Sequence, residues 1–253
     1  MITARATWHL TMRGLRETLR QPGVEVSNLF IPLFFFFVTV GAISNIAGDA
    51  FGVDNYEGFQ LPVAVLQGAA GAASSAGLYM VTDIERGYFD KLLLSPAPRV
   101  SLVLGRLAAD GLRVTGLTVV ILVVALIAGA GMEAGPLGAV TLVILAGAFG
   151  FCYSGIGLSI ALRTGSPQAA QLGFLVFFPL LFLSPAFAPK EIFDSWLEFL
   201  ATINPVTYIL QGMRSLVLEG WEWEKLGYAA AAIAGFGAFT ITLTLAALKT
   251  RTD

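Results

Sequence analysis

Long apolar runs without Asp, Glu, Lys or Arg divide the chain. A helix that crosses a bilayer needs about 20 mainly apolar residues, and each of these runs approaches or exceeds that length. We therefore predict six transmembrane helices, which place both ends of the chain on the same side of the membrane. The six intervals are Val26 to Gly48, Gly58 to Thr82, Val114 to Met132, Ala134 to Leu162, Thr164 to Pro189 and Leu226 to Leu248.

The pattern changes between the fifth and sixth intervals. The apolar run is interrupted by Pro179 and Pro185, and a short acidic and aromatic segment follows it. The next apolar piece, Phe199 to Met213, is too short to cross a bilayer comfortably. We predict a re-entrant helical hairpin over residues 188–218, with Asn204 capping a helix that starts at Pro205.

The first residues, 3–21, have the pattern of a helix at the membrane surface. At about 100° per residue, Trp8, Met12 and Leu15 share one stripe, and arginines cluster on the adjoining face. A plain cytoplasmic tail is the alternative. The bend expected at Pro22-Gly23 favours the interfacial helix.

Composition and charge placement agree with a multi-pass membrane protein. The chain is 56% hydrophobic and only 13% charged, far from the balance of a soluble domain. Most Lys and Arg residues fall on one side of the predicted layout, and most acidic residues fall on the other. The positive-inside rule then places both termini in the cytoplasm.

The sequence offers no site for catalysis on this chain. No Gly-Lys pair is present, which excludes a phosphate-binding loop of the Gly-Lys-Ser/Thr type. One His and one Cys cannot form a metal cluster or a nucleophile–base set. We expect no enzyme activity, no metal, no cofactor on this chain and no nucleic-acid partner.

The loop at residues 83–99 is the clearest candidate for contact with a partner protein. A short charged helix with an apolar side, ended by Pro96 and Pro98, can insert into a groove on a partner protein. A solvated interfacial loop explains the same residues equally well. Beyond the loop, Arg106, Asp110 and Arg113 share one helix face, which we interpret as an exposed salt-bridged stripe. A second partner-contact strip is the alternative.

Aromatic side chains in the spans could form the walls of a pathway for an apolar or amphipathic molecule. Contact with lipid explains most of these rings equally well. Uncharged spans argue against coupling to an ion gradient, which usually needs acidic residues inside the membrane. The candidate pathway residues are Phe34, Phe37, Gln67, Tyr153 and Phe178.

Two motifs resemble those of a known family. Residues 177–216 read FFPLLFLSPAFAPKEIFDSWLEFLATINPVTYILQGMRSL, which resembles the C-terminal signature of ABC-2 type permeases, especially the daunorubicin and multidrug resistance branch. Glu85-Arg86-Gly87 with Leu93 is similar to the coupling-helix motif of that family, although Tyr88-Phe89-Asp90 departs from its usual small hydroxyl residue and acid. The coupling residues implied are Glu85, Arg86, Gly87, Phe89, Lys91, Leu93, Pro96 and Arg99.

The resemblance implies one ABC-2 transmembrane domain over residues 1–253 in the cell membrane, paired with a second copy. Two separate ATP-binding subunits would hold ATP and Mg. The re-entrant segment would form an outer gate with Phe187, Trp196, Asn204, Pro205 and Tyr208. Export of a drug or lipophilic metabolite is the favoured function. Export of a lipid-linked glycan or complex lipid, or a non-transport scaffold or sensor subunit, are the alternatives.

Overall fold

The described part of the chain is helical. The structure is a computed structural model that describes residues 2–94 and 98–252, and no strand occurs in those ranges. The predicted all-helical class is therefore confirmed. The elements are α1 (Ile2–Leu19), α2 (Pro22–Phe51), α3 (Tyr56–Glu85), α4 (Tyr88–Leu93), α5 (Arg99–Ile127), α6 (Gly135–Thr164), α7 (Pro167–Phe182), the 3-10 turn η1 (Lys190–Ile192), α8 (Ser195–Ile203), α9 (Pro205–Leu218) and α10 (Trp223–Thr252).

Five of these helices are long and apolar enough to cross a membrane, namely α2, α3, α5, α6 and α10. The fifth predicted interval, Thr164 to Pro189, contains a shorter helix. Its helix α7 has 16 residues and ends at Phe182. Pro185 cannot donate a helical hydrogen bond, which explains why the helix does not continue to Pro189.

Helix α5 differs most from its predicted bounds. It begins at Arg99 rather than Val114 and ends at Ile127 rather than Met132. Charged side chains do not end a helix when partners neutralise them, and Arg106, Asp110 and Arg113 all lie within this one. The start instead follows Pro98, a residue that disfavours helix before it.

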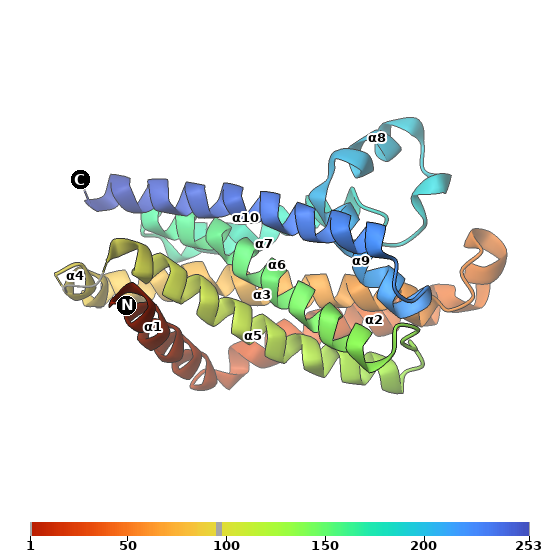
Figure 1. Ribbon diagram of the computed structural model, residues 1–253, viewed down its shortest axis with the longest axis horizontal. Coiled ribbons are helices and arrows are strands. Elements are labelled where there is room, and N and C mark those ends of the chain that lie inside the picture. Colours follow the sequence, from red (N-terminus) through yellow and green to blue (C-terminus); the bar gives the residue numbers. More distant parts are fainter. Residues whose placement is uncertain (1, 95–97, 253) are drawn as a thin grey trace.

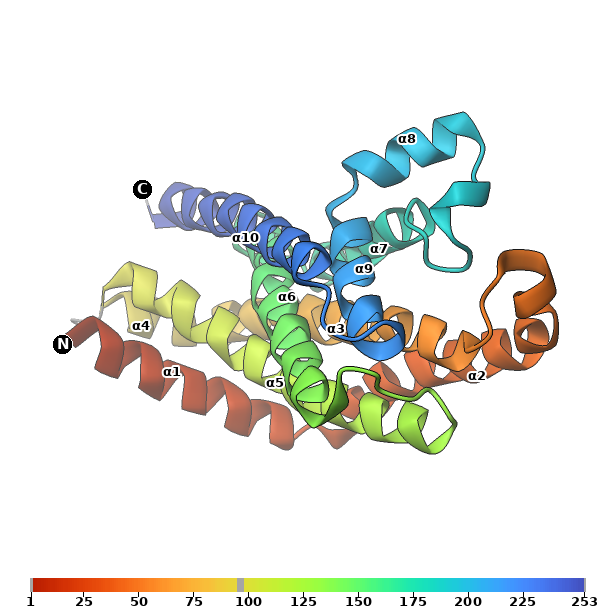
Figure 2. The ribbon, with the colours of Figure 1, turned by 45° about the vertical axis from the view of Figure 1, so that its right-hand side comes forward.

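The long helices run side by side and define two ends of the molecule (Figure 1). We call the end that carries both termini, α1 and α4 the proximal end. The opposite distal end carries the α2–α3 and α5–α6 connections together with α9. Helix α8 stands away from the bundle in both ribbon views (Figure 2).

Helix α3 forms the centre of the bundle. It contacts α2, α5, α6, α7 and α9, and 83% of its most apolar stretch is buried, compared with 11% for α2. Small residues allow its closest contact, because a β-carbon at Gly77 would lie 2.5 Å from the carbonyl oxygen of Gly157 in α6. Small residues at such a contact let two helix backbones approach closely.

Helix α1 lies along α5 at the proximal end. Thr11, Gly14 and Thr18 face the bundle and are buried, while Trp8 is 59% exposed. A β-carbon at Gly14 would stand 2.7 Å from the β-carbon of Ala109. A helix is therefore present where the interfacial helix was predicted, and it holds to the bundle through small and hydroxyl residues rather than through its apolar stripe. Its place at a membrane surface stays a prediction.

The region predicted as a re-entrant hairpin is divided into unequal parts. Helix α8 contacts little besides η1, whereas α9 packs against α3, α6 and α10. The break between them falls at Asn204, as predicted. The Asn204 side chain accepts a hydrogen bond from the backbone N–H of Val206 at 3.0 Å, and Pro205 is the first residue of α9.

Candidate functional site

A sharp turn joins α3 to α4 at the proximal end. Glu85 is the last residue of α3, and Arg86 closes the helix through hydrogen bonds to the preceding turn. Gly87 has a φ of +65°, a left-handed conformation that glycine adopts without steric cost. Both Glu85 and Arg86 are exposed. The turn thus presents one acidic and one basic side chain together.

The short helix α4 has one buried and one exposed side. Phe89 is 1% exposed and belongs to the apolar cluster of Met80, Val103 and Leu107, with Leu93 packed against its edge. On the other side, Lys91 is exposed and Leu94 is 89% exposed. Phe89 therefore anchors the helix to the bundle. Leu94, just after the helix, leaves an apolar side chain exposed for contact with another molecule. The predicted coupling residue Pro96 lies outside the described residues.

Helix α1 is tied to this turn through Arg13. Its guanidinium donates to both carboxylate oxygens of Asp83, at 2.9 and 2.5 Å, and lies 3.8 Å from the ring centre of Tyr88. Burial lowers the pKa of Arg13, but the hydrogen bond and charge of Asp83 more than offset this, so the pKa lies above its ordinary value. A two-point bond of this kind restricts movement of α1 relative to the α3–α4 turn.

The stripe on α5 is buried, which corrects the prediction of an exposed salt-bridged face. Arg106 and Asp110 are 7% and 1% exposed, and Arg113 is 4% exposed. The reason is that α1 and α2 cover the stripe and bring the neutralising carboxylates. Arg106 lies 3.2 Å from Glu17 of α1, and Arg113 lies 2.6 Å from Glu25 of α2.

The same network reaches α3. Arg113 donates to the carbonyl oxygen of Ala72 at 3.1 Å. The guanidinium carbons of Arg106 and Arg113 lie 4.6 and 5.6 Å from the ring centre of Tyr79. Helices α1, α2, α3 and α5 are thus joined by buried charge near the proximal end. None of these side chains is available as a contact strip for a partner.

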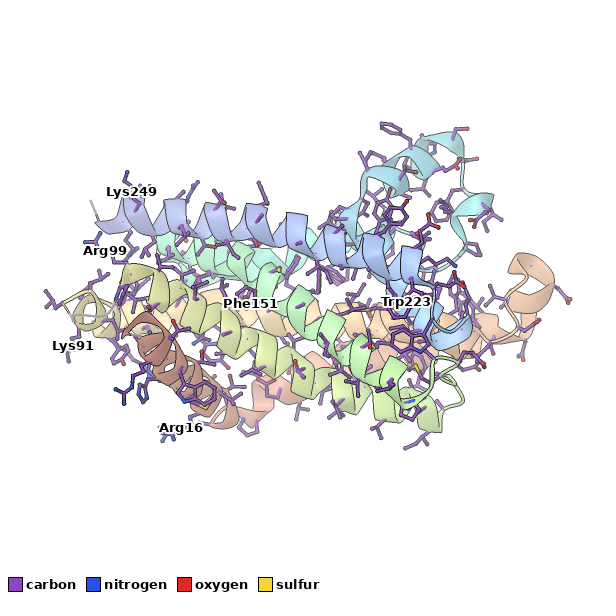
Figure 3. All side chains as sticks on the ribbon, viewed as in Figure 1. Arg16, Lys91, Arg99, Phe151, Trp223 and Lys249 are labelled. Atoms are coloured by element: carbon purple, nitrogen blue, oxygen red, sulfur yellow. The ribbon has the colours of Figure 1, made fainter. Side chains whose placement is uncertain are left out.

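Positive charge remains on the proximal surface. Arg16, Arg20 and Arg86 line a hollow of about 750 Å³ together with His9 and Trp8. Within the described residues, Arg16, Arg20 and Arg86 form no ion pair, since Glu17 and Asp83 are already paired with other arginines. Figure 3 shows Arg16, Lys91, Arg99 and Lys249 at this end and Trp223 at the other.

A cavity opens between α2, α3 and α7 in the proximal half of the bundle. Its volume is about 320 Å³, and Asn28, Gln67, Gln171 and Phe174 are among the residues that line it. Gln67 is 5% exposed. The cavity brings one predicted pathway residue, Gln67, together with polar residues from two other helices.

The other predicted pathway residues lie elsewhere. Phe34 and Phe37 are about half exposed on the outward side of α2. Tyr153 is fully buried between α6 and α7, where its hydroxyl donates to the carbonyl oxygen of Gly173 at 2.7 Å. Phe178 packs between Phe174 and Phe182 along α7. The structure therefore does not gather these five residues around one cavity.

Two of the predicted gate residues meet the distal end of α7, and the others do not. Asn204 donates to the carbonyl oxygen of Leu180 at 2.5 Å, and the ring of Phe187 packs against Phe182. Tyr208 donates to the carbonyl oxygen of Thr202 at 2.7 Å. Trp196 is 62% exposed on α8. Asn204 and Phe187 thus close on the end of α7, while Trp196 points to the surroundings.

A buried arginine supports this distal region. Arg214 of α9 is 8% exposed and donates to the carbonyl oxygens of Phe59 at 3.2 Å and Pro185 at 3.0 Å. Its guanidinium carbon lies 3.4 Å from the ring centre of Phe59. On the other side of the turn, the hydroxyl of Tyr56 donates to the carbonyl oxygen of Phe187 at 3.0 Å. Polar side chains therefore hold the non-helical segment after α7.

Residues 5–218 match the family described as ABC-2 type transporter. That range covers most of α1 and all of α2 to α9, and it leaves out α10. The chain belongs to the ABC-2 type transporter family. Members of this family are the membrane subunits of ABC transporters, so the chain is a permease. The family resemblance noted in the sequence is thereby confirmed.

The permease matches several relatives over most of its own length and most of theirs. It is 24% identical to the daunorubicin resistance ABC transporter permease protein DrrB1 of Streptomyces coeruleorubidus over 86% of this chain and 76% of that protein. It is 25% identical to the putative transport permease ycf38 of Porphyra purpurea over 85% and 74%. For the probable doxorubicin resistance ABC transporter permease protein DrrC of Mycobacterium tuberculosis, identity is 22% over 83% and 76%.

Two residues of the permease that sequence reasoning missed stand out. Leu94 belongs to a run of three leucines, and only the helix phase of α4 separates it from the half-buried Leu93. A signal existed, since Leu94 follows the exposed Lys91 by three residues, on the same helix face. No sequence signal marked Arg214, because its sequence neighbours do not reveal the carbonyl groups of α3 and of the α7–α8 segment that it binds.

Proposed function

We propose that this permease forms the membrane part of an exporter that moves a hydrophobic or amphipathic compound out of the cell. A second copy and two ATP-binding subunits, which hold ATP and Mg, complete the assembly. The observation that carries this proposal is the match of residues 5–218 to the ABC-2 family, with resistance permeases among the relatives. The chain itself supplies the moving membrane part and hydrolyses no ATP.

The proximal end is the proposed contact with the ATP-binding subunit, on the cytoplasmic side. Support comes from the α3–α4 turn, where Glu85, Arg86 and Leu94 are exposed while Phe89 anchors the short helix. A push on α4 would reach α1 through Arg13 and Asp83, and α5 through the Arg106–Glu17 pair. Energy enters only if the partner binds ATP with different affinity in the two states of the assembly.

The membrane layout that we propose has six crossings, with α7 and the segment that follows it as the fifth. Helix α9 would then return into the distal half as a re-entrant element, and Phe187 and Asn204 would lie at the outer gate. The cavity of about 320 Å³ suits a compact molecule better than a lipid-linked glycan. Its size thus favours the drug or lipophilic metabolite over the lipid-linked glycan.

The test is ATP-driven transport by the complete assembly. The permease is co-expressed with candidate ABC ATP-binding subunits from the same organism, and daunorubicin uptake into inverted membrane vesicles is followed with and without ATP. We expect ATP-dependent uptake, reduced in Arg86→Ala, and co-purification of the ATPase. Absence of both uptake and substrate-stimulated ATP hydrolysis, with a panel of lipophilic compounds, would contradict the exporter.

A further inference from the structure

The cavity between α2, α3 and α7 contains polar groups that the protein itself does not satisfy. Nδ2 of Asn28 and Oε1 of Gln67 are buried, and neither has a hydrogen-bond partner within the described residues. Both residues line the cavity. Buried polar atoms without partners are uncommon because each costs about 1–3 kcal/mol. Their joint occurrence at one cavity points to a ligand that supplies the missing partners.

The two orphaned atoms are complementary in kind. Nδ2 of Asn28 is a donor, and Oε1 of Gln67 is an acceptor. A ligand that satisfies both must carry an acceptor, such as a carbonyl or ether oxygen, and a donor, such as a hydroxyl or N–H. One hydrogen-bonding group of each kind therefore faces the cavity.

The remaining walls exclude a charged ligand group. Within the described residues, none of those that line the cavity is Asp, Glu, Lys or Arg. Glu25, one turn from Asn28, directs its charge to Arg113 at 2.6 Å. A charge held here without a counter-charge would be costly at membrane depth. Ile31, Pro32 and Phe174 supply apolar surface for the rest of the ligand.

The space depends on a glycine. At Gly71, a β-carbon would lie 3.3 Å from Oδ1 of Asn28 and 3.7 Å from the Phe174 ring. A larger side chain at this position would project between the two walls. The cavity lies beside the first turns of α2 and in the second half of α3, so it opens in the half of the bundle that carries the termini.

We propose that this cavity binds an apolar, uncharged ligand that bears a hydrogen-bond acceptor and a hydrogen-bond donor, recognised by Asn28 and Gln67. The assignment rests on the proposed function, because it specifies the chemistry of the exported compound. Resistance to a compound that is apolar but lacks the donor–acceptor pair is not expected to depend on these residues.

Photochemical labelling of the purified permease in lipid nanodiscs tests the site without ATP or a partner. The probes are 4-(hydroxymethyl)benzophenone, which is neutral with a carbonyl and a hydroxyl, 4-ethylbenzophenone, which lacks the donor, and charged 4-benzoylbenzoate. Mass spectrometry quantifies cross-linked peptides from α2, α3 and α7. We expect the hydroxymethyl probe to label these peptides about 3- to 10-fold more than the ethyl probe, the ratio that one net hydrogen bond gives. The charged probe should label them least.

Variants separate recognition from space. Asn28→Leu and Gln67→Met should each remove the preference for the hydroxymethyl probe, and Gly71→Leu should block all three probes. Asn45→Leu is the matched control, since Asn45 is exposed on the same helix and lies outside the cavity. Thermal unfolding midpoints and gel filtration report whether each variant folds.

Three outcomes would overturn the site. Equal labelling by the hydroxymethyl and ethyl probes would mean an apolar crevice. Unchanged probe preference in Gln67→Met and Asn28→Leu, with lowered thermal stability, would mean that the two amides serve the fold. Labelling of α2, α3 and α7 peptides unaffected by Gly71→Leu would place the probe elsewhere. Labelling as expected without ATP-driven uptake would contradict the exporter and keep the site, so the two proposals fail separately.

Discussion

Single polar side chains hold the segments of this permease that cannot form regular helix. Arg214 is the clearest case, because it donates to carbonyl groups of α3 and of the turn after α7 while covering the Phe59 ring. A hydrophobic residue of similar size could not donate these hydrogen bonds, so it could not replace the arginine.

Replacing Arg214 with methionine should destabilise the protein by about 2 kcal/mol or more, since two buried acceptors lose their donor. Lys225→Met is the matched control. It removes a basic residue at the same end, but its ion pair with Glu219 is exposed and is worth less than about 1 kcal/mol. Thermal unfolding in detergent measures both. Equal midpoints for the two variants would show that Arg214 does not brace the turn.

The buried pair of Arg113 and Glu25 makes a second prediction for single residues. Removal of one charge leaves the other uncompensated, which typically costs about 3–5 kcal/mol, whereas removal of both can cost much less. Arg113→Met should therefore be more harmful than Arg113→Met combined with Glu25→Gln. A double-mutant cycle of unfolding midpoints measures the coupling. Additive effects would contradict an energetic link between α2 and α5.

At the scale of helices, the apolar pattern of the sequence predicted that the long helices are present, but it did not predict where each one begins and ends. The apolar runs predicted α2, α3, α6 and α10 closely. Charge-free intervals failed for α5, because neutralising Glu17 and Glu25 come from other helices and let Arg106 and Arg113 be buried. The cavity and the Arg214 contacts depend on residues far apart in the chain. One sequence without relatives aligned to it contains no signal for such pairings.

Helix α4 carries the prediction that belongs to this scale. Leu94 is exposed and Leu93 packs against the cluster around Phe89, so equal substitutions should act differently. Leu94→Ser should reduce co-purification of the ATPase several-fold and leave the thermal midpoint unchanged, because it removes apolar contact area from the proposed interface only. Leu93→Ser should instead lower the midpoint. If Leu94→Ser retains full ATPase binding and transport, α4 does not dock through this residue.

For the whole molecule, the number of membrane crossings must agree with the positions of the two termini, because an even number leaves both on the same side. Five crossings would leave the two ends of the chain on opposite sides of a membrane, yet both termini lie at the proximal end (Figure 1). The sixth crossing that we propose would place both ends on one side. Helix α7, with 16 residues, is roughly 24 Å long. It falls short of the hydrocarbon core of about 30 Å, and in the proposed layout the braced segment from Ser184 to Pro189 would supply the remainder.

Cysteine labelling in whole cells tests this layout. The chain has a single cysteine, Cys152, so Cys152→Ala provides a background for new cysteines. A membrane-impermeant maleimide should label Trp196→Cys and Trp223→Cys in intact cells, because the proposed layout places the distal end outside. Arg16→Cys and Lys91→Cys should react only after permeabilisation, since that layout places the basic proximal end in the cytoplasm. Arg163→Cys decides the count. Arg163 lies in the last turn of α6, shortly before α7, so protection there with labelling at Trp196→Cys requires α7 and its extension to cross. Labelling of Lys91→Cys in intact cells would show the opposite orientation, in which α4 lies outside the cell and no cytoplasmic ATPase can contact it.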